Sequence, residues 1–231
     1  MENINSFVAS SIVEFKDERL HVSDLSRKIN NILSDNEKFF FMRRCEEESE
    51  IIVGSQDDKT KGKQDAYNKQ IAESQLVIFL FGNRFGEYTE EELRVAGEAA
   101  KNNGYPKILA CFKKGCSPEP ERKDKLITML NEYKIEQCVF EDNLGLELFV
   151  LLYIEAYLHA NNIDFTTSYD GKYICVGVKR IIDTSEINWV KKAEQGTIES
   201  NIDKIKEAMK KLIAGEGIGN FEQHILRTLV N

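Results

Sequence analysis

The segment best equipped for chemistry combines a glycine-bearing loop with a run of glutamates. Leu76–Phe81 is an apolar run of strand length, residues 82–86 can turn the chain, and residues 90–92 are all acidic. Open α/β sheets bind ligands at the carboxyl ends of their strands, which is where this loop falls. Thr89 and Glu92 also have the spacing of a helix capping box. A carboxylate of this segment therefore either takes part in chemistry or caps a helix.

Alternating apolar and amphipathic stretches predict the elements that must position this segment. The apolar run at residues 38–43 lacks a polar face, which is typical of a parallel strand covered on both sides. Strands that alternate with helices predict a parallel sheet with right-handed crossovers and helices on both faces. The expected strands are 4–10, 38–43, 76–81, 107–112 and 137–141, and the expected helices are 14–33, 64–73, 90–102, 122–133 and 144–160, with a long polar loop at 44–63.

The pattern changes after the fifth expected helix, where a β-hairpin is expected. Residues 165–169 and 172–178 flank Asp170 and Gly171, a pair that indicates a type I′ turn. A charged helix with apolar residues at core spacing follows at 198–213, and a last short helix reaches the end of the chain.

This pattern predicts three parts. They are an α/β domain at residues 1–162, a β-hairpin extension at 163–195 and a helical connector at 196–231. The chain stops on an apolar face that includes Leu226 and Leu229. Such a face indicates either an interface or a longer protein that continues into a missing C-terminal region.

Composition excludes several classes of protein. The net charge of −8 argues against nucleic acid and anionic membrane as partners. The five cysteines are scattered and include no C-x-x-C pair, so neither a disulfide framework nor a zinc site is expected. No signal peptide is evident, and we expect a cytoplasmic protein. Glu147 and Glu155 interrupt the apolar stretch at 144–160, which predicts a buried core helix and not a membrane span.

The sequence lacks a hydrolase triad motif and a dinucleotide-binding motif. The three histidines fall in expected helices, and no serine or cysteine elbow accompanies them, which argues against a hydrolase triad. The glycines at residues 215–219 do not have the dinucleotide-binding spacing, and they follow a helix where that fingerprint requires a strand.

The ordered motifs of residues 4–160 resemble the TIR domain, and more closely the bacterial TIR-like families. The first is the opening Phe7-Val8-Ala9-Ser10-Ser11 with Phe15-Lys16-Asp17-Glu18-Arg19. The second is Ile71-Ala72-Glu73-Ser74 before the third strand, although Gln75 stands where the family usually has aspartate. The third is a G-x-Y-T-x-E-E-L-x-x-A signature after that strand. The resemblance implies a flavodoxin-like, TIR-like fold with a doubly wound five-stranded parallel sheet, extended here by the hairpin and C-terminal helices.

The resemblance also implies an activity. Many TIR domains hydrolyse NAD+ at the bond between nicotinamide and ribose and need one glutamate near the start of the third helix. That position matches Glu92, with Glu91 as the alternative if the register differs by one. Nicotinamide leaves from a carbon that becomes oxocarbenium-like, and a nearby carboxylate stabilises that charge or orients the ribose and water.

The same resemblance implies roles for polar residues at the other strand ends. Ser10 and Ser11 could bind the ribose or the diphosphate, and Arg43, Arg44 and Arg84 could hold phosphate. Each has a structural alternative: the serines could form a turn and helix cap, and the arginines after the second strand could pair with the glutamates at residues 46–48.

Three functions follow. The first is a bacterial antiphage or innate immune effector that hydrolyses NAD+ without a further cofactor and is active when assembled as a homo-oligomer, with a possible sensor domain or signal protein as partner. The second is a non-catalytic TIR-like adaptor that acts by assembly. The third is an enzyme similar to nucleoside deoxyribosyltransferases. We expect no metal, nucleic acid or membrane partner for any of them.

Overall fold

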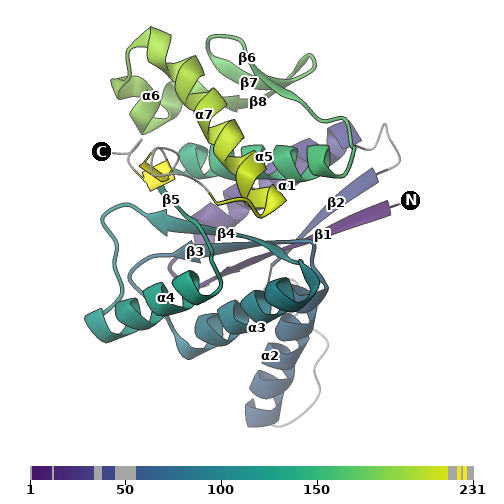
Figure 1. Cartoon of the computed structure of the whole chain (residues 1–231), viewed down its shortest axis with the longest axis vertical. Coiled ribbons are helices and arrows are strands. Elements are labelled where there is room, and N and C mark those ends of the chain that lie inside the picture. The colour runs from purple at the N-terminus through teal and green to yellow at the C-terminus, as the bar shows by residue number, and fades with distance from the viewer. Residues whose placement is uncertain are drawn as a thin grey trace.

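A five-stranded parallel sheet forms the centre of the chain (Figure 1). The computed structural model describes residues 2–11, 13–33, 38–44, 56–217, 223–224 and 226–227. The strands are β1 (Glu2–Ser10), β2 (Lys38–Arg44), β3 (Leu76–Phe81), β4 (Lys107–Lys113) and β5 (Gln137–Phe140), in the order β2-β1-β3-β4-β5. Every neighbouring pair in this sheet is parallel. This order is that of the flavodoxin-like fold, so the predicted fold class is confirmed.

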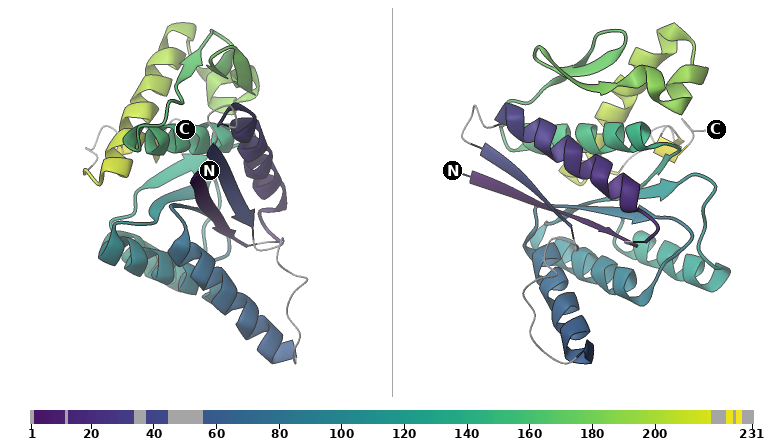
Figure 2. Two further views of the ribbon diagram at one scale, coloured as in Figure 1. Left: turned by 90° about the vertical axis from the view of Figure 1, so that its right-hand side faces the viewer. Right: turned by 180° about the vertical axis from the view of Figure 1, so that it is seen from behind.

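Helices cover both faces of the sheet (Figures 1 and 2). Two helices, α1 (Lys16–Leu33) and α5 (Asn143–Ala160), pack on one face. On the other face lie α2 (Gln56–Glu73), α3 (Glu87–Asn103) and α4 (Pro120–Glu132). Alternate residues of β1 and β3 point into the two hydrophobic layers, as the period of a strand requires.

The helix α5 is buried along almost its whole length, as its composition predicted. Its two acidic residues have polar partners: His21 Nδ1 lies 2.6 Å from Glu147 Oε1, Lys28 Nζ lies 3.6 Å from Glu147 Oε2, and Thr167 donates two hydrogen bonds to Glu155. These contacts follow the rule that buried charges need partners. Within the described residues, no helix is both long enough and apolar enough to cross a membrane.

The helix α2 corrects the prediction of a loop at 44–63, because residues 56–63 are helical. Its sequence carries no apolar stripe there, so hydrophobic periodicity gave no signal for it. Residues 45–55 of the predicted loop lie outside the described residues.

A small antiparallel sheet follows α5, with strands β6 (Thr167–Tyr169), β7 (Tyr173–Val176) and β8 (Lys179–Asp183). The hairpin prediction is confirmed for β6 and β7, and β8 is an additional strand. The turn between β6 and β7 differs from the predicted one. Gly171 and Lys172 are its central residues, and of these two only Gly171 has a positive φ, +97°. One positive φ at the first central residue is typical of type II′, not type I′.

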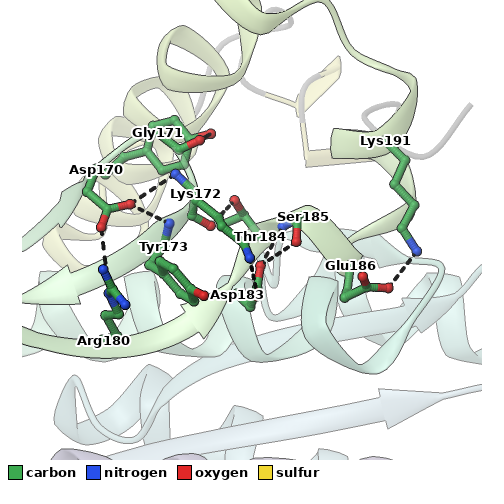
Figure 3. Close-up of polar contacts among 11 residues, drawn as sticks. Asp170, Gly171, Lys172, Tyr173, Arg180, Asp183, Thr184, Ser185, Glu186 and Lys191 are labelled. Carbon is green, nitrogen blue, oxygen red and sulfur yellow. Dashed lines mark hydrogen bonds and ion pairs between the residues drawn. The ribbon is translucent and has the colours of Figure 1, made fainter.

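The Asp170 side chain explains where this turn forms. Its Oδ1 accepts hydrogen bonds from the backbone N–H groups of Lys172 (2.9 Å) and Tyr173 (2.6 Å), as Figure 3 shows. Arg180 of β8 lies over the ring of Tyr173, 4.4 Å from its centroid. These contacts tie all three strands to the turn.

The C-terminal helices fold back onto α5. They are α6 (Asn188–Lys192) and α7 (Gln195–Ala214). Ile202, Ile205, Met209 and Ile213 of α7 are buried, as their spacing predicted, and they share one hydrophobic cluster with α5 and α1. The predicted last short helix lies mostly outside the described residues. The three-part division of the chain stays a prediction.

Candidate active site

Glu92 is buried on the first turns of α3, near the carboxyl ends of the central strands. The helix begins at Glu87 after Gly86, whose extended backbone forms the N-cap, and among the described residues no side chain caps it. Thr89 therefore lies inside the first turn, and the predicted capping box is wrong. Glycine is an acceptable N-cap, and the acidic first turn favours the earlier start. Glu92 lies more than one turn after the start of α3, so it does not act as a capping acid, and only 6% of its surface is exposed.

Burial gives Glu92 an unusual titration. The pKa of this carboxyl is raised from 4.5 to about 7, mainly because burial removes it from water, and the nearby charge of Glu91 acts in the same direction. The positive charge of Arg19 and a hydrogen bond from Gln64 act in the opposite direction. Glu92 is therefore present in both protonation states near neutral pH, a property common at catalytic sites.

Arg19 is a site residue that the sequence analysis did not single out. It lies on α1, is fully buried, and its Nη1 donates to Ser10 Oγ at 3.0 Å. It also donates to the Ser10 carbonyl oxygen at 3.4 Å. A signal was available, because Arg19 falls in the apolar stripe of α1 between Phe15 and Val22, where a buried cation needs compensation.

Ser10 and Arg19 lie at the topological switch point of the sheet, and Arg19 is close enough to Glu92 for its charge to act on that carboxyl. The helix that follows β1 packs on one face, and the helix that follows β3 packs on the other. Ser10 pairs with Leu80 in the neighbouring strand, so the ends of β1 and β3 lie side by side. In doubly wound sheets a crevice opens at this position and takes the ligand.

Three other predicted site residues, Ser11, Glu91 and Arg84, differ in burial and in hydrogen bonding. Ser11 is half-buried, and its Oγ accepts a hydrogen bond from the backbone of Glu14 at 3.4 Å. Glu91 is half-buried and accepts a hydrogen bond from Asn68 Nδ2 at 2.7 Å. Arg84 is exposed on the loop between β3 and α3.

The two arginines of β2 are separated from the serines. Arg43 pairs with Phe7, three residues before Ser10, which sets it back by roughly 10 Å along the strand. It is exposed and lines a small cavity of about 30 Å³ with Asn5 and Gln70. Arg44 is the last residue of β2, and its side chain lies outside the described part of the structure.

No protein family matches this chain, and no curated protein matches it either. What the structure establishes is therefore the architecture alone: an α/β fold with a five-stranded parallel sheet of flavodoxin-like order.

Proposed function

We propose that this chain is a TIR-like NAD+ hydrolase that cleaves the bond between nicotinamide and ribose, with Glu92 as its catalytic carboxylate. The observation that supports this most is the placement of Glu92, which is buried beside Arg19 and near the switch point of the sheet. The resemblance to TIR-like families also implies that the essential glutamate is this residue. The biological role that follows is a bacterial antiphage or innate immune effector, switched on by assembly of several copies.

The proposed reaction has two steps, the departure of nicotinamide and the addition of water. Nicotinamide leaves with the electron pair of the C1′–N bond, and the positive charge spreads over C1′ and the ring oxygen. The ionised Glu92 stabilises this charge in a water-poor environment, where electrostatic interactions are strong. Water then adds to C1′ and loses a proton, which a carboxylate with a pKa near 7 can accept.

Arg19 and Ser10 act as positioning residues in this proposal. Arg19 favours the ionised form of Glu92 and is itself held by the Ser10 hydroxyl and carbonyl oxygens. The Ser10 hydroxyl accepts from Arg19 and so keeps its own proton for a ribose or phosphate oxygen.

The second candidate is a non-catalytic adaptor that acts through assembly. One observation favours it: Glu92 already has internal partners, Arg19 and Gln64, and such a network can serve packing alone. A deoxyribosyltransferase-like enzyme ranks third, because Glu92 does not lie in the signature expected for that family.

Nicotinamide release tests these candidates. The purified protein is incubated with NAD+, first dilute and then concentrated or crowded, beside Glu92→Gln and Glu92→Ala. Glu98→Gln is a matched control because Glu98 is an exposed α3 acid paired with Arg94. Release that both Glu92 variants abolish and the control retains supports the hydrolase. Release that survives in both variants moves the assignment to Glu91. Absence of release even in the assembled state favours the adaptor, and release of a free base from a deoxynucleoside favours the third candidate.

A further inference from the structure

The carboxylate of Glu14 occupies a pair of backbone N–H groups at the end of β3. Asn83 N donates to Glu14 Oε1 at 2.6 Å, and Arg84 N donates to Glu14 Oε2 at 3.2 Å. Gly82 allows this approach, because a Cβ there would lie 2.4 Å from Glu14 Oε1. Two successive N–H groups that hold both oxygens of one anion have the geometry of an anion-binding loop.

Other contacts keep this loop in place. The Asn83 side chain bonds the next strand-to-helix connection, where Ser117 N donates to Asn83 Oδ1 at 3.3 Å. Glu14 itself lies in the turn that precedes α1 and is half-buried. Rotation of its side chain would therefore expose the two N–H groups without disturbing a helix or strand.

Two cationic residues, Arg84 on the loop itself and Lys113 at the end of β4, belong to the surroundings of these N–H groups. The Arg84 side chain is exposed, and within the described residues no ion pair involves it. Lys113 is the last residue of β4, and its Nζ lies 2.6 Å from Glu18 Oε1 of α1. That hydrogen bond is the main cause of the raised pKa of Lys113, and the negative charge of Glu14 contributes, so Lys113 lies within electrostatic reach of the Glu14 carboxylate. Cations beside paired N–H groups favour phosphate.

We propose that the N–H groups of Asn83 and Arg84 form a phosphate subsite, and that Glu14 is its resident competitor. The identity of the ligand rests on the proposed function: the diphosphate of a dinucleotide displaces the Glu14 side chain when it binds. The subsite lies on the loop that leads into α3, the helix that carries Glu92. Displacement of Glu14 would thus be part of substrate entry and would weaken binding to the resting protein.

Titration with inorganic pyrophosphate tests the subsite without any need for catalysis. Amide NMR follows the backbone signals of Asn83 and Arg84 in the wild-type protein, in Glu14→Gln and in Glu98→Gln. The neutral glutamine is a weaker occupant, so pyrophosphate should bind Glu14→Gln about 3- to 10-fold more tightly, equivalent to about 1 kcal/mol. Glu98→Gln makes the same change in net charge and should leave the affinity unchanged. Well-dispersed spectra show that each variant is folded.

Glu14→Asp supplies an independent variant. Its shorter side chain keeps the charge but does not reach both N–H groups, so its affinity should fall between those of the wild type and Glu14→Gln. Pyrophosphate that leaves both amide signals unmoved in all variants overturns the proposal, as does equal affinity in the wild type and Glu14→Gln.

The subsite and the proposed hydrolase activity can fail separately. Tighter pyrophosphate binding by Glu14→Gln without nicotinamide release would support the subsite and reject the hydrolase. Nicotinamide release with no effect of Glu14→Gln on pyrophosphate affinity or on the KM for NAD+ would retain the hydrolase and reject the subsite.

Discussion

Glu155 of α5 binds Thr167 of β6 through both of its carboxylate oxygens. The Thr167 backbone N donates to Oε1 at 2.8 Å, and the Thr167 hydroxyl donates to Oε2 at 2.7 Å. Lys206 of α7 completes the contact, since its Nζ donates to the Thr167 carbonyl oxygen at 2.6 Å and lies 3.8 Å from Glu155 Oε1. This cluster joins the core helix α5 to β6 and to α7.

Loss of this carboxylate should destabilise the whole chain. Glu155→Ala leaves a buried N–H and a hydroxyl of Thr167 without their acceptor and removes the carboxylate that faces the Lys206 ammonium, and we expect a loss of about 2–4 kcal/mol in the free energy of unfolding. Urea unfolding measures it. Glu98→Ala, which removes an exposed carboxylate paired with Arg94, should change stability by less than about 0.5 kcal/mol. Equal effects of the two substitutions would show that the cluster contributes nothing.

Glu92 should make stability depend on pH. Its folded pKa of about 7 exceeds the ordinary value of 4.5, so between these pH values the folded protein keeps a proton that the unfolded chain releases. The stability of the wild type should therefore fall as pH rises through this window, and that of Glu92→Gln should not fall for this reason. The variant should gain up to about 3 kcal/mol over the wild type at pH 8 relative to pH 4.5. Unfolding curves at the two pH values measure this. If the difference in stability between the two proteins is the same at both pH values, the raised pKa of Glu92 is contradicted.

Activity should show the opposite trend if ionised Glu92 is required. The value of kcat/KM for NAD+ should be about tenfold lower at pH 6 than on its plateau above pH 8, because protonation removes the anion that stabilises the transition state. A pH series of initial rates checks the profile. A flat profile between pH 6 and pH 8 would exclude Glu92 as the group whose ionisation limits the reaction.

Arg19 should set the midpoint of that profile. Its charge lowers the pKa of Glu92, so Arg19→Gln should move the acidic limb of the profile to higher pH. Arg19→Lys keeps the charge and should restore part of the shift. A purely structural role for Arg19 would lower the amount of folded enzyme but leave the midpoint where it is.

Two glycines form a matched pair for packing. A Cβ on Gly97 of α3 would lie 2.4 Å from the ring of Tyr133, whereas a Cβ on Gly196 of α7 would meet no atom within 4 Å. Gly97→Ala should therefore destabilise the protein by about 1–3 kcal/mol through overpacking. Gly196→Ala should stabilise it by about 0.5–1 kcal/mol through the lower entropy of the unfolded chain. Thermal unfolding compares them, and the same sign for both would refute this packing.

The local elements were predictable because their causes are local. The apolar run Leu76–Phe81 has the length and composition of a buried strand, and the structure confirms its bounds. The start of α2 was not predictable in this way, since residues 56–63 form a helix without an apolar stripe. The start of α3 was misplaced because Thr89 is a good cap by residue type, whereas the chain caps this helix with Gly86.

By itself, the sequence determined the alternation of strands and helices, the parallel sheet and the presence of a carboxylate near the carboxyl ends of its strands. Hydrophobic periodicity is sufficient for these features, because it depends on residues close together in the chain. Only the tertiary structure decided the environment of that carboxylate: the burial of Glu92, the placement of Arg19 against Ser10 and the capture of Glu14 by the loop after β3. Desolvation and Coulomb interactions depend on distances between residues remote in sequence, and packing of the helices on the sheet sets those distances.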